Sequence, residues 1–257
     1  MREARRRRPV RSVSLTALVA AVGLAAAACG GDEARSADAA RTSSGEVQAS
    51  TSEDGAQEAG GFPSGWRVRT DRGETSPEAV DLVATEGGVR VRPGPRAVYW
   101  DPETTATGTY RARATFHRLN DPGPEAYGLF VGGRDLQAEG QDYLYFLVRG
   151  DGSYLVKHRA GAETHTLVEW TEHSAVRGGS ASGGAVTNTL AVESGPDTVR
   201  FLVNGTEVER LERAPMLNSD GQVGVRVNHR LDVRIEGPGV EPLEGTDAGG
   251  GGSSESG

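Results

Sequence analysis

The sequence predicts an all-β fold, and three observations support this prediction. Short segments rich in Val, Tyr, Phe, Thr and Leu recur between Gly, Asp, Asn and Pro residues across residues 62–239. No window of this region sustains the i, i+3, i+4, i+7 spacing of apolar residues that marks an amphipathic helix. Two glycine-containing turns lie between neighbouring segments. The number of segments predicts about thirteen strands in one domain.

The first 28 residues have the pattern of an export signal. An arginine-rich head, from Arg2 to Arg11, precedes an apolar run over residues 13–28, and the small residues Ala26-Ala27-Ala28 come directly before Cys29. This arrangement resembles a bacterial lipoprotein signal, which is cut before a cysteine that then carries the lipid. A secretory signal cut after Ala28 and an uncleaved anchor are the alternatives, although a spanning helix needs about 20 apolar residues.

The charge of the chain argues against a nucleic-acid partner. The chain holds 28 Lys and Arg and 36 Asp and Glu, a net charge of −8. Residues 1–28 contain six arginines and one glutamate, so their removal leaves 22 basic and 35 acidic residues, a net charge of −13. Phosphates repel such a protein, so we expect no nucleic acid to bind. Cys29 is the one cysteine of the chain, so we expect no disulfide within the domain.

Two segments without a core flank the predicted domain. Residues 29–61 consist mainly of Gly, Ala, Ser, Glu and Asp and contain one large apolar residue, Val47, so they cannot bury enough surface to offset the entropy of ordering. Residues 240–257 have the Gly/Ser composition of a flexible tail. The sequence therefore predicts a signal peptide over residues 1–28, a disordered tether over 29–61, a β-sandwich over 62–239 and a disordered tail over 240–257.

Seven strands stand out from the pattern of apolar residues and turns. They are expected at Thr109–His117, Tyr127–Val131, Tyr143–Arg149, Tyr154–His158, Leu190–Glu193, Thr198–Val203 and Val223–Asn228. Asn204-Gly205 and Gly150-Asp151-Gly152 have the residues that tight turns require. We therefore expect one hairpin from Val199 to Val208 and another from Tyr145 to Val156.

Alternation within two of these strands separates a core face from a free face. In the first strand the apolar side chains are Tyr110, Ala112, Ala114 and Phe116, and the opposite face carries Arg111, Arg113 and His117. In the strand from Asp142 to Arg149 the apolar side is Leu144, Phe146 and Val148. Since a sandwich buries one face of each sheet, the other face is either solvated or forms a binding groove. The predicted binding residues are Tyr143, Tyr145, Arg149, Arg111, Arg113 and His117.

A series of short motifs spans residues 126–227: Gly128-Leu129-Phe130-Val131-Gly132-Gly133, Tyr143-Leu144-Tyr145-Phe146, Asp151-Gly152-Ser153-Tyr154-Leu155-Val156-Lys157, Trp170, Asn188-Thr189-Leu190-Ala191-Val192, Val203-Asn204-Gly205 and Gly221-Gln222-Val223-Gly224-Val225. This series resembles the concanavalin A-like (lectin/glucanase) jelly roll, in particular its bacterial branch similar to family 16 glycoside hydrolases and 3-keto-disaccharide hydrolases. The resemblance implies two curved antiparallel sheets, with a concave face that holds a sugar chain in many relatives.

The catalytic pattern of that family has no counterpart here. Family 16 glucanases carry Glu-x-Asp-x-x-Glu on one strand, and this sequence has no such triplet. Glu169 and Glu172 are three residues apart, a spacing that sends them to opposite faces of a strand. His158, His165 and His173 are seven and eight residues apart, unlike the closely spaced ligands of zinc sites. We therefore predict no catalytic residue, no metal site and no cofactor.

Aromatic side chains are the remaining candidates for contact with a sugar, because the apolar C–H faces of sugar rings pack on aromatic planes. Trp100, Trp170 and Tyr127 are of this kind, and for each of them we expect packing within the fold instead.

Together these patterns predict an exported lipoprotein, held by Cys29 on the outer membrane or the outer face of the plasma membrane, in the periplasm or at the cell surface. Its single jelly roll is expected to bind a carbohydrate or a similar glycan ligand without catalysis. Two alternatives stay open. One is a glycoside-cleaving enzyme of the 3-keto-disaccharide hydrolase type, with His and Asp or Glu residues as proton carriers. The other is a protein-interaction domain at the cell envelope. The sequence predicts neither the ligand nor the oligomeric state.

Overall fold

The computed structural model describes residues 61–121, 123–179, 184–214 and 217–243. The signal segment, Cys29 and the tether up to residue 60 lie outside this part of the chain, and so does the tail from residue 244. The described residues contain fourteen strands and one short 3-10 helix, η1 (Pro77–Ala79). None of them forms a helix that is long and apolar enough to cross a membrane.

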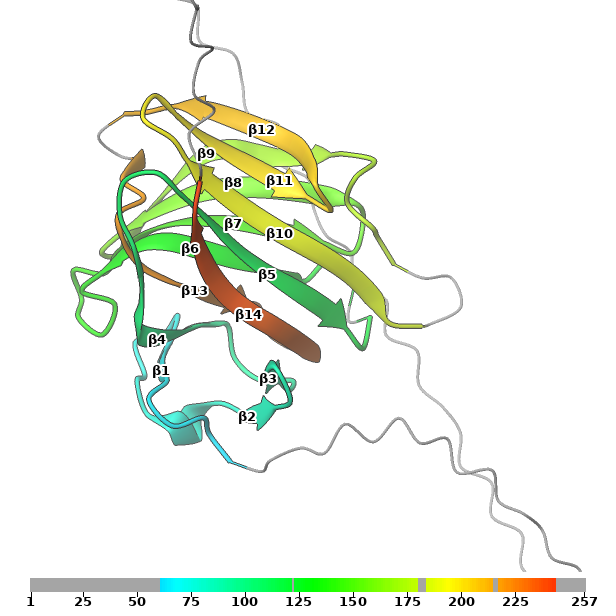
Figure 1. Cartoon of the computed structure of the whole chain (residues 1–257). Coiled ribbons are helices and arrows are strands. Elements are labelled where there is room, and N and C mark those ends of the chain that lie inside the picture. Colours follow the sequence, from blue (N-terminus) through cyan, green and yellow to red (C-terminus); the bar gives the residue numbers. More distant parts are fainter. Residues whose placement is uncertain (1–60, 122, 180–183, 215–216, 244–257) are drawn as a thin grey trace, which may run out of the picture. The chain divides into compact units, whose positions relative to one another are not determined.

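The strands form two antiparallel sheets of seven strands each (Figure 1). The first, called the β7 sheet here, has the order β1 (Arg67–Thr70), β4 (Ala97–Ala106), β13 (Gly221–Val227), β6 (Ala126–Arg134), β7 (Asp142–Arg149), β8 (Ser153–Ala160) and β9 (Glu163–Glu172). The second, the β10 sheet, has the order β12 (Thr206–Glu212), β11 (Thr198–Val203), β10 (Val186–Ser194), β5 (Tyr110–Arg118), β14 (Val233–Pro242), β3 (Gly88–Val91) and β2 (Leu82–Thr85). The predicted all-β jelly-roll sandwich is thus confirmed.

All seven strands expected from the sequence are present, within a few residues of their predicted ends. The two hairpins are also present. β11 and β12 pair through a turn in which Asn204 and Gly205 have φ angles of 51° and 82°, the left-handed region that a two-residue hairpin requires. β7 and β8 pair around Gly150-Asp151-Gly152. Turn chemistry therefore sets the register of β7 and β8 and that of β11 and β12 next to their turn, and the second pair shifts register between Phe201 and Leu202.

One apolar core lies between the two sheets. It contains the predicted inward residues of β5, which are Tyr110, Ala112, Ala114 and Phe116, and those of β7, which are Leu144, Phe146 and Val148. The rings of Phe146 and Phe201 are completely buried, and their centroids lie 5.3 Å apart. Phe146 is on β7 and Phe201 is on β11, and these strands belong to different sheets, so the contact between the two rings joins the two layers. The alternation rule therefore assigned both inner faces correctly.

The C-terminal boundary of the domain differs from the expected one. The prediction placed the start of the tail at residue 240, but β14 continues to Pro242. Its last residues pair with β5, with Val240 opposite Ala112 and Pro242 opposite Tyr110. The segment lacks a strongly apolar pattern, and backbone pairing with a central strand holds it in place instead.

Candidate binding site

The outer face of the β7 sheet carries a second apolar cluster, separate from the core between the sheets. Trp100, Phe130, Tyr143 and Tyr145 belong to it, with Val98, Ala126, Leu136, Leu147 and Leu155, and Trp170 packs against it. Gly224 leaves room for this packing, because a Cβ atom at that position would lie 2.5 Å from Cε1 of Phe130. This face is therefore a packed layer and not a bare, solvated sheet surface.

This cluster corrects the expectation that Tyr143 and Tyr145 are free to stack on a ligand. Both side chains point to the predicted outer face, but Tyr143 is 2 % exposed and Tyr145 is 8 % exposed. The three rings of Phe130, Tyr143 and Tyr145 follow one another with centroid separations of 5.4 and 5.6 Å. Burial also raises the pKa of both phenols. Trp100 and Tyr127, expected to pack within the fold, are 2 % and 1 % exposed.

Arg226 of β13 lies over the two tyrosines. Its Nη1 and Nη2 donate to the two carboxylate oxygens of Asp71, at 2.9 and 2.7 Å, and Nη1 also lies 3.2 Å from the hydroxyl of Tyr143. Its guanidinium carbon is 5.3 Å from the centroid of the Tyr145 ring. Burial opposes the charge on Asp71, but the hydrogen bond and charge of Arg226 hold its pKa below its usual value. The pair is therefore a fixed ionic contact above the aromatic layer.

Beside this pair the outer face opens into a hollow of about 380 Å³, called the Trp170 hollow here. Its lining comes from β7, β8, β9 and β13, from the segments before β4 and β6, and from the residue after β13. The lining residues are Arg96, Pro124, Glu125, Tyr145, Leu147, Arg149, Leu155, Lys157, Trp170, Arg226 and Asn228. It thus combines two aromatic rings with four basic side chains and one acidic side chain.

Arg149 and Trp170 form one wall of the Trp170 hollow. The guanidinium carbon of Arg149 lies 4.2 Å from the centroid of the indole ring, a cation–π contact. Nε of Arg149 lies 2.6 Å from Oδ2 of Asp151, in the β7–β8 turn. Arg149 is a quarter exposed and Trp170 is partly exposed, so both reach the solvent side of the wall. Arg149 therefore lies on the outer face, as alternation along β7 predicts, and its role in binding stays a prediction.

Glu125 and Asn228 also line the hollow, and His229 lies beside Glu125. Oε1 of the buried Glu125 lies 2.7 Å from Nδ1 of His229 and 3.7 Å from Nη2 of Arg230. Oδ1 of Asn228 is buried and has no hydrogen-bond partner among the described residues. A buried acceptor without a donor costs roughly 1–3 kcal/mol. Asn228 thus carries a local energetic cost at the edge of the hollow.

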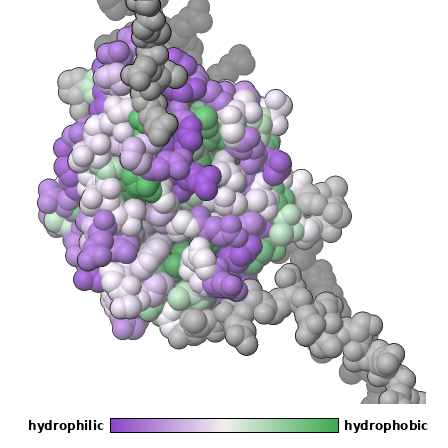
Figure 2. All heavy atoms as spheres, in the orientation of Figure 1, coloured by the Kyte–Doolittle hydropathy of each residue, from purple (hydrophilic) through white to green (hydrophobic). Residues whose placement is uncertain are grey.

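The other predicted binding residues lie on the opposite side of the molecule. Arg111, Arg113 and His117 are on the outer face of β5, in the β10 sheet, which lies toward the viewer in Figure 1. Both ring nitrogens of His117 have hydrogen-bonding partners on this face. Nδ1 lies 3.0 Å from Oγ1 of Thr187, and Nε2 lies 3.0 Å from Oε1 of Glu236. Hydrophilic residues predominate on this side of the molecule in Figure 2.

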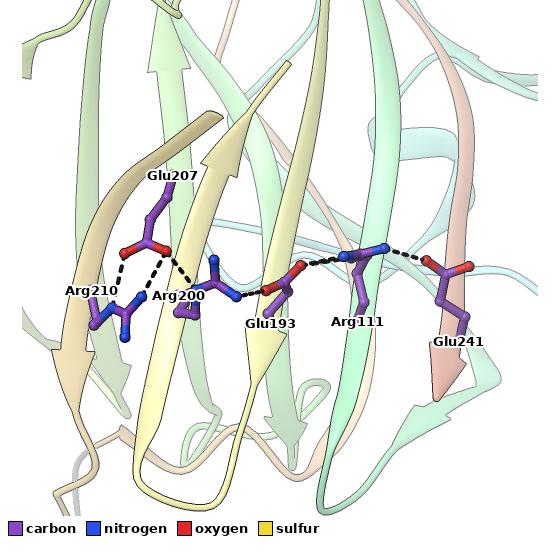
Figure 3. Close-up of polar contacts among 6 residues, drawn as sticks. All are labelled: Arg111, Glu193, Arg200, Glu207, Arg210 and Glu241. Carbon is purple, nitrogen blue, oxygen red and sulfur yellow. Dashed lines mark hydrogen bonds and ion pairs between the residues drawn. The ribbon is translucent and has the colours of Figure 1, made fainter. Parts of the chain in front are cut away.

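Arg111 takes part in a row of ion pairs that crosses five strands of the β10 sheet (Figure 3). The row runs Glu241, Arg111, Glu193, Arg200, Glu207 and Arg210, from β14 through β5, β10 and β11 to β12. We call it the ion-pair row. Its central carboxylate, Glu193, is 3 % exposed and is held at 2.5 Å by Arg111 and at 2.6 Å by Arg200. The guanidinium of Arg111 is therefore paired with two carboxylates of the same sheet, those of Glu193 and Glu241.

A second hollow, of about 490 Å³, lies beside the ion-pair row and is called the Arg113 hollow here. It is lined by Arg111, Arg113, Arg177, Thr189, Ala191, Leu202, Asn204 and Gly205, without an aromatic side chain. The six predicted binding residues are therefore not one site. Tyr145 and Arg149 meet in the Trp170 hollow, Arg111 and Arg113 meet in the Arg113 hollow, and Tyr143 and His117 line neither.

Of the eleven residues that line the Trp170 hollow, two, Tyr145 and Arg149, are among the predicted binding residues, and the other nine are not. Lys157 faces it because the β7–β8 hairpin places Lys157 opposite Tyr145, a register that the turn at residues 150–152 does predict. Trp170 was expected to be structural, and it both packs on the outer cluster and lines the hollow. Arg96 and Glu125 come from segments before strands, and no periodic signal in the sequence marks them.

Four of the five histidines, His117, His158, His165 and His229, each lie within 4 Å of one carboxylate. Nε2 of His158 lies 3.1 Å from Oδ2 of Asp142, and its ring stacks on His165 at 5.9 Å, whereas His173 packs edge-on against Tyr154. Within the described part of the chain, no three His, Cys, Asp or Glu side chains come together in a group that could hold a metal ion.

Comparison with known proteins identifies the fold. No family model and no curated protein matches the sequence. Among solved structures, the carbohydrate-binding module CBM66 from Bacillus subtilis matches with a TM-score of 0.51 and 11% identity, over 70% of this chain and 99% of that chain. Alginate lyase A1-II′ matches with a TM-score of 0.46 and 7% identity, over 69% of this chain and 94% of that chain. The similarity to CBM66 shows the fold alone, a concanavalin-like jelly roll.

Proposed function

We propose that this domain binds carbohydrate in the Trp170 hollow. The observation that carries the proposal is the juxtaposition of a partly exposed indole, Trp170, with the cationic and amide groups of Arg149, Lys157 and Asn228 around one hollow of about 380 Å³. Sugar rings present apolar C–H faces that pack on aromatic planes, and their hydroxyls need donors and acceptors at the edge of that plane.

The polar groups of the hollow suit hydroxyl recognition. Asn228 lines the hollow, and its amide nitrogen is a donor that suits sugar oxygens. Lys157 and Arg149 are donors only, and they can bond the lone pairs of hydroxyl or ring oxygens. The floor beneath these groups is rigid, since Tyr145 is buried under Arg226. A fixed floor lowers the ordering cost of binding a small ligand.

The proposed role is binding without bond cleavage. Glycosidases generally place two carboxyl groups about the scissile bond, roughly 5–10 Å apart. Among the described residues, one carboxylate lines the Trp170 hollow, that of Glu125, and its Oε1 is 2.7 Å from His229. The Glu125–His229 contact is also the observation that favours the second candidate, a glycoside-cleaving enzyme in which this pair would move the proton.

A glycan panel tests both candidates. Calorimetry with the wild type should detect binding without release of reducing ends, and Trp170→Ala should weaken the affinity roughly five- to thirtyfold, the equivalent of about 1–2 kcal/mol of stacking. Trp66→Ala is the matched control, because Trp66 packs against the inter-sheet core and lies outside the hollow. Cleavage that is lost in Glu125→Gln would favour the enzyme. The absence of both binding and cleavage across the panel would contradict the proposal.

We also propose that the domain is exported and anchored to the cell envelope by a lipid on Cys29. The support is in the sequence, where six arginines, an apolar run and Ala26-Ala27-Ala28 precede that cysteine. A lipid on Cys29 would leave residues 30–60 as the connection to the sandwich.

A further inference from the structure

The Trp170 hollow has the opposite charge to the chain as a whole. The chain has a net charge of −8, yet the hollow is lined by four basic side chains and one acidic side chain. Arg96, Arg149, Lys157 and Arg226 come from three strands and one connecting segment, so the hollow gathers them from distant parts of the sequence. A hollow with walls of low dielectric constant strengthens the potential of such a group of charges.

Two of these cations form no close ion pair, although the charge of Arg96 also acts on Asp71. Within the described chain, neither Nζ of Lys157 nor the guanidinium of Arg96 makes a hydrogen bond or an ion pair. Arg149 is paired with Asp151, and Arg226 is paired with Asp71. The single acidic side chain of the lining, Glu125, already faces His229 and Arg230. The hollow therefore keeps an excess of positive charge after its internal pairs are formed.

We propose that the ligand of this hollow is an acidic saccharide, whose carboxylate or sulfate group binds Lys157 and Arg96 while a sugar ring contacts Trp170. This inference rests on the proposed carbohydrate-binding function and narrows its ligand class. Hydrogen bonds between a cation and an anionic oxygen are roughly twice as strong as neutral ones, so an anionic sugar gains more here than a neutral sugar.

A third hollow continues the same face and suits a ligand of several sugar units. It measures about 350 Å³ and is lined by Arg69, Asp71, Arg72, Gly73, Glu139, Gln141, Arg159, Gly161 and Ala162. Asp71 lines this hollow and Arg226 lines the Trp170 hollow, and the two side chains are bonded at 2.7 Å. The two hollows therefore meet at this ion pair. An acidic oligosaccharide can contact basic side chains on both sides of it.

The test compares oligosaccharides that differ only in charge. Neutral and C6-carboxylated (uronate) forms of 1,4-linked gluco-, manno- and galacto-hexasaccharides are titrated into the wild type by calorimetry at low and high salt. At least one uronate form should bind roughly tenfold or more tightly than its neutral form at low salt, and the difference should shrink as salt is raised. Poly-glutamate of similar length should compete poorly, because it lacks the sugar ring.

Two charge variants and one control locate the effect. Lys157→Gln and Arg96→Gln should each weaken uronate binding roughly five- to tenfold, and each should weaken neutral binding by a clearly smaller factor, because a neutral sugar loses no charge-assisted hydrogen bond. Arg113→Gln removes the same charge from the opposite sheet and should leave both unchanged. Arg96 is exposed, so Arg96→Gln should leave the fold stable. This variant therefore tests the effect of charge on binding even if Lys157→Gln lowers stability.

The possible outcomes distinguish the proposal of an acidic ligand from the proposal that the hollow binds carbohydrate at all. Equal binding of neutral and uronate forms, unaffected by Lys157→Gln and Arg96→Gln, overturns the acidic ligand and leaves carbohydrate binding in place. Equal competition by poly-glutamate also overturns it, because the hollow is then a general anion site. Failure of every saccharide, neutral and acidic, overturns the proposed function itself.

Discussion

Oε2 of Glu193 lies 2.6 Å from Nη1 of Arg200, and the carboxylate is buried while the guanidinium is 39 % exposed. The same arrangement holds with Arg111 on the neighbouring strand. A buried carboxylate between two solvated cations joins three strands of the β10 sheet through their side chains as well as their backbones. The stability of this sheet should therefore depend on the centre of the ion-pair row far more than on its ends.

Glu193→Ala should lower the free energy of unfolding by about 1–3 kcal/mol, since hydrogen bonds to two guanidinium groups are lost. Glu241→Ala, at the half-exposed end of the ion-pair row, should cost less than about 1 kcal/mol. Chemical denaturation of both variants measures the difference. Equal losses in the free energy of unfolding for the two variants would show that the position of a residue within the ion-pair row does not affect its contribution to stability.

Glu207 should make stability depend on acid pH. Its hydrogen bond with Arg210, followed by that with Arg200, lowers its pKa from the usual 4.5 to about 2. Because the unfolded chain takes up this proton at higher pH than the folded chain, the contribution of Glu207 is complete above about pH 4.5 and is lost as the pH falls toward 2. Denaturation of wild type and Glu207→Gln between pH 2 and 6 should show a steeper loss for the wild type. Parallel curves would contradict the assignment.

Phe146→Ala and Phe201→Ala should each cost about 3–5 kcal/mol, because both rings are fully buried between the sheets. Tyr143→Ala should also be destabilising, by more than about 2 kcal/mol, since the outer cluster encloses this ring. Tyr143→Phe keeps the ring and removes only the contact with Arg226, so its cost should be near 1 kcal/mol. A loss below about 1 kcal/mol for Tyr143→Ala would mean that the outer face is more open than described.

Removal of residues 244–257 and of residues 1–60 should leave the thermal stability of the domain unchanged, because the described strands lie within residues 61–243. A shorter protein that ends at Gly239 should melt several degrees lower, since it lacks the residues of β14 that pair with Ala112, Arg111 and Tyr110. Melting curves of the two proteins decide this. Identical midpoints would restore the earlier boundary at residue 239.

Cys29→Ala should abolish lipid attachment and release the protein from the membrane fraction, because the lipid supplies the apolar anchor. Incorporation of radioactive palmitate in the producing cells measures this. Ser43→Ala, in the expected tether, is the control and should keep its label. Undiminished label on Cys29→Ala would contradict the anchor.

The inner faces of the strands could be predicted from the sequence, and the outer faces could not. Phe146 and Leu144 alternate with Tyr143 and Tyr145, and that alternation correctly separates the two sides of β7. Whether an outer side chain meets solvent depends on what lies over it. Arg226, distant in sequence from Tyr145, covers that ring, and only the paired sheet order brings the two together.

The grouping of the site residues failed for a related reason. Arg113 and Arg149 both lie on outward faces, but β5 and β7 belong to different sheets, and alternation within a strand carries no information about its sheet. The hairpin turn after β7 did carry such information, because it places Lys157 next to Tyr145. Local turn chemistry thus predicts neighbours across one hairpin, whereas longer connections are decided by the packing of the whole sandwich.

Trp170 stands on β9, the edge strand of its sheet, where the pairing with β8 shifts register on both sides of Val156. Edge strands with irregular pairing open locally at a lower free energy than central strands, so their amide hydrogens exchange sooner. A ligand that spans from Trp170 to Arg226 on central β13 would fasten this edge to the middle of the sheet. Ligand binding in the hollow would then slow amide hydrogen exchange along β9. This strand contributes only one side chain, that of Trp170, to the lining of the hollow.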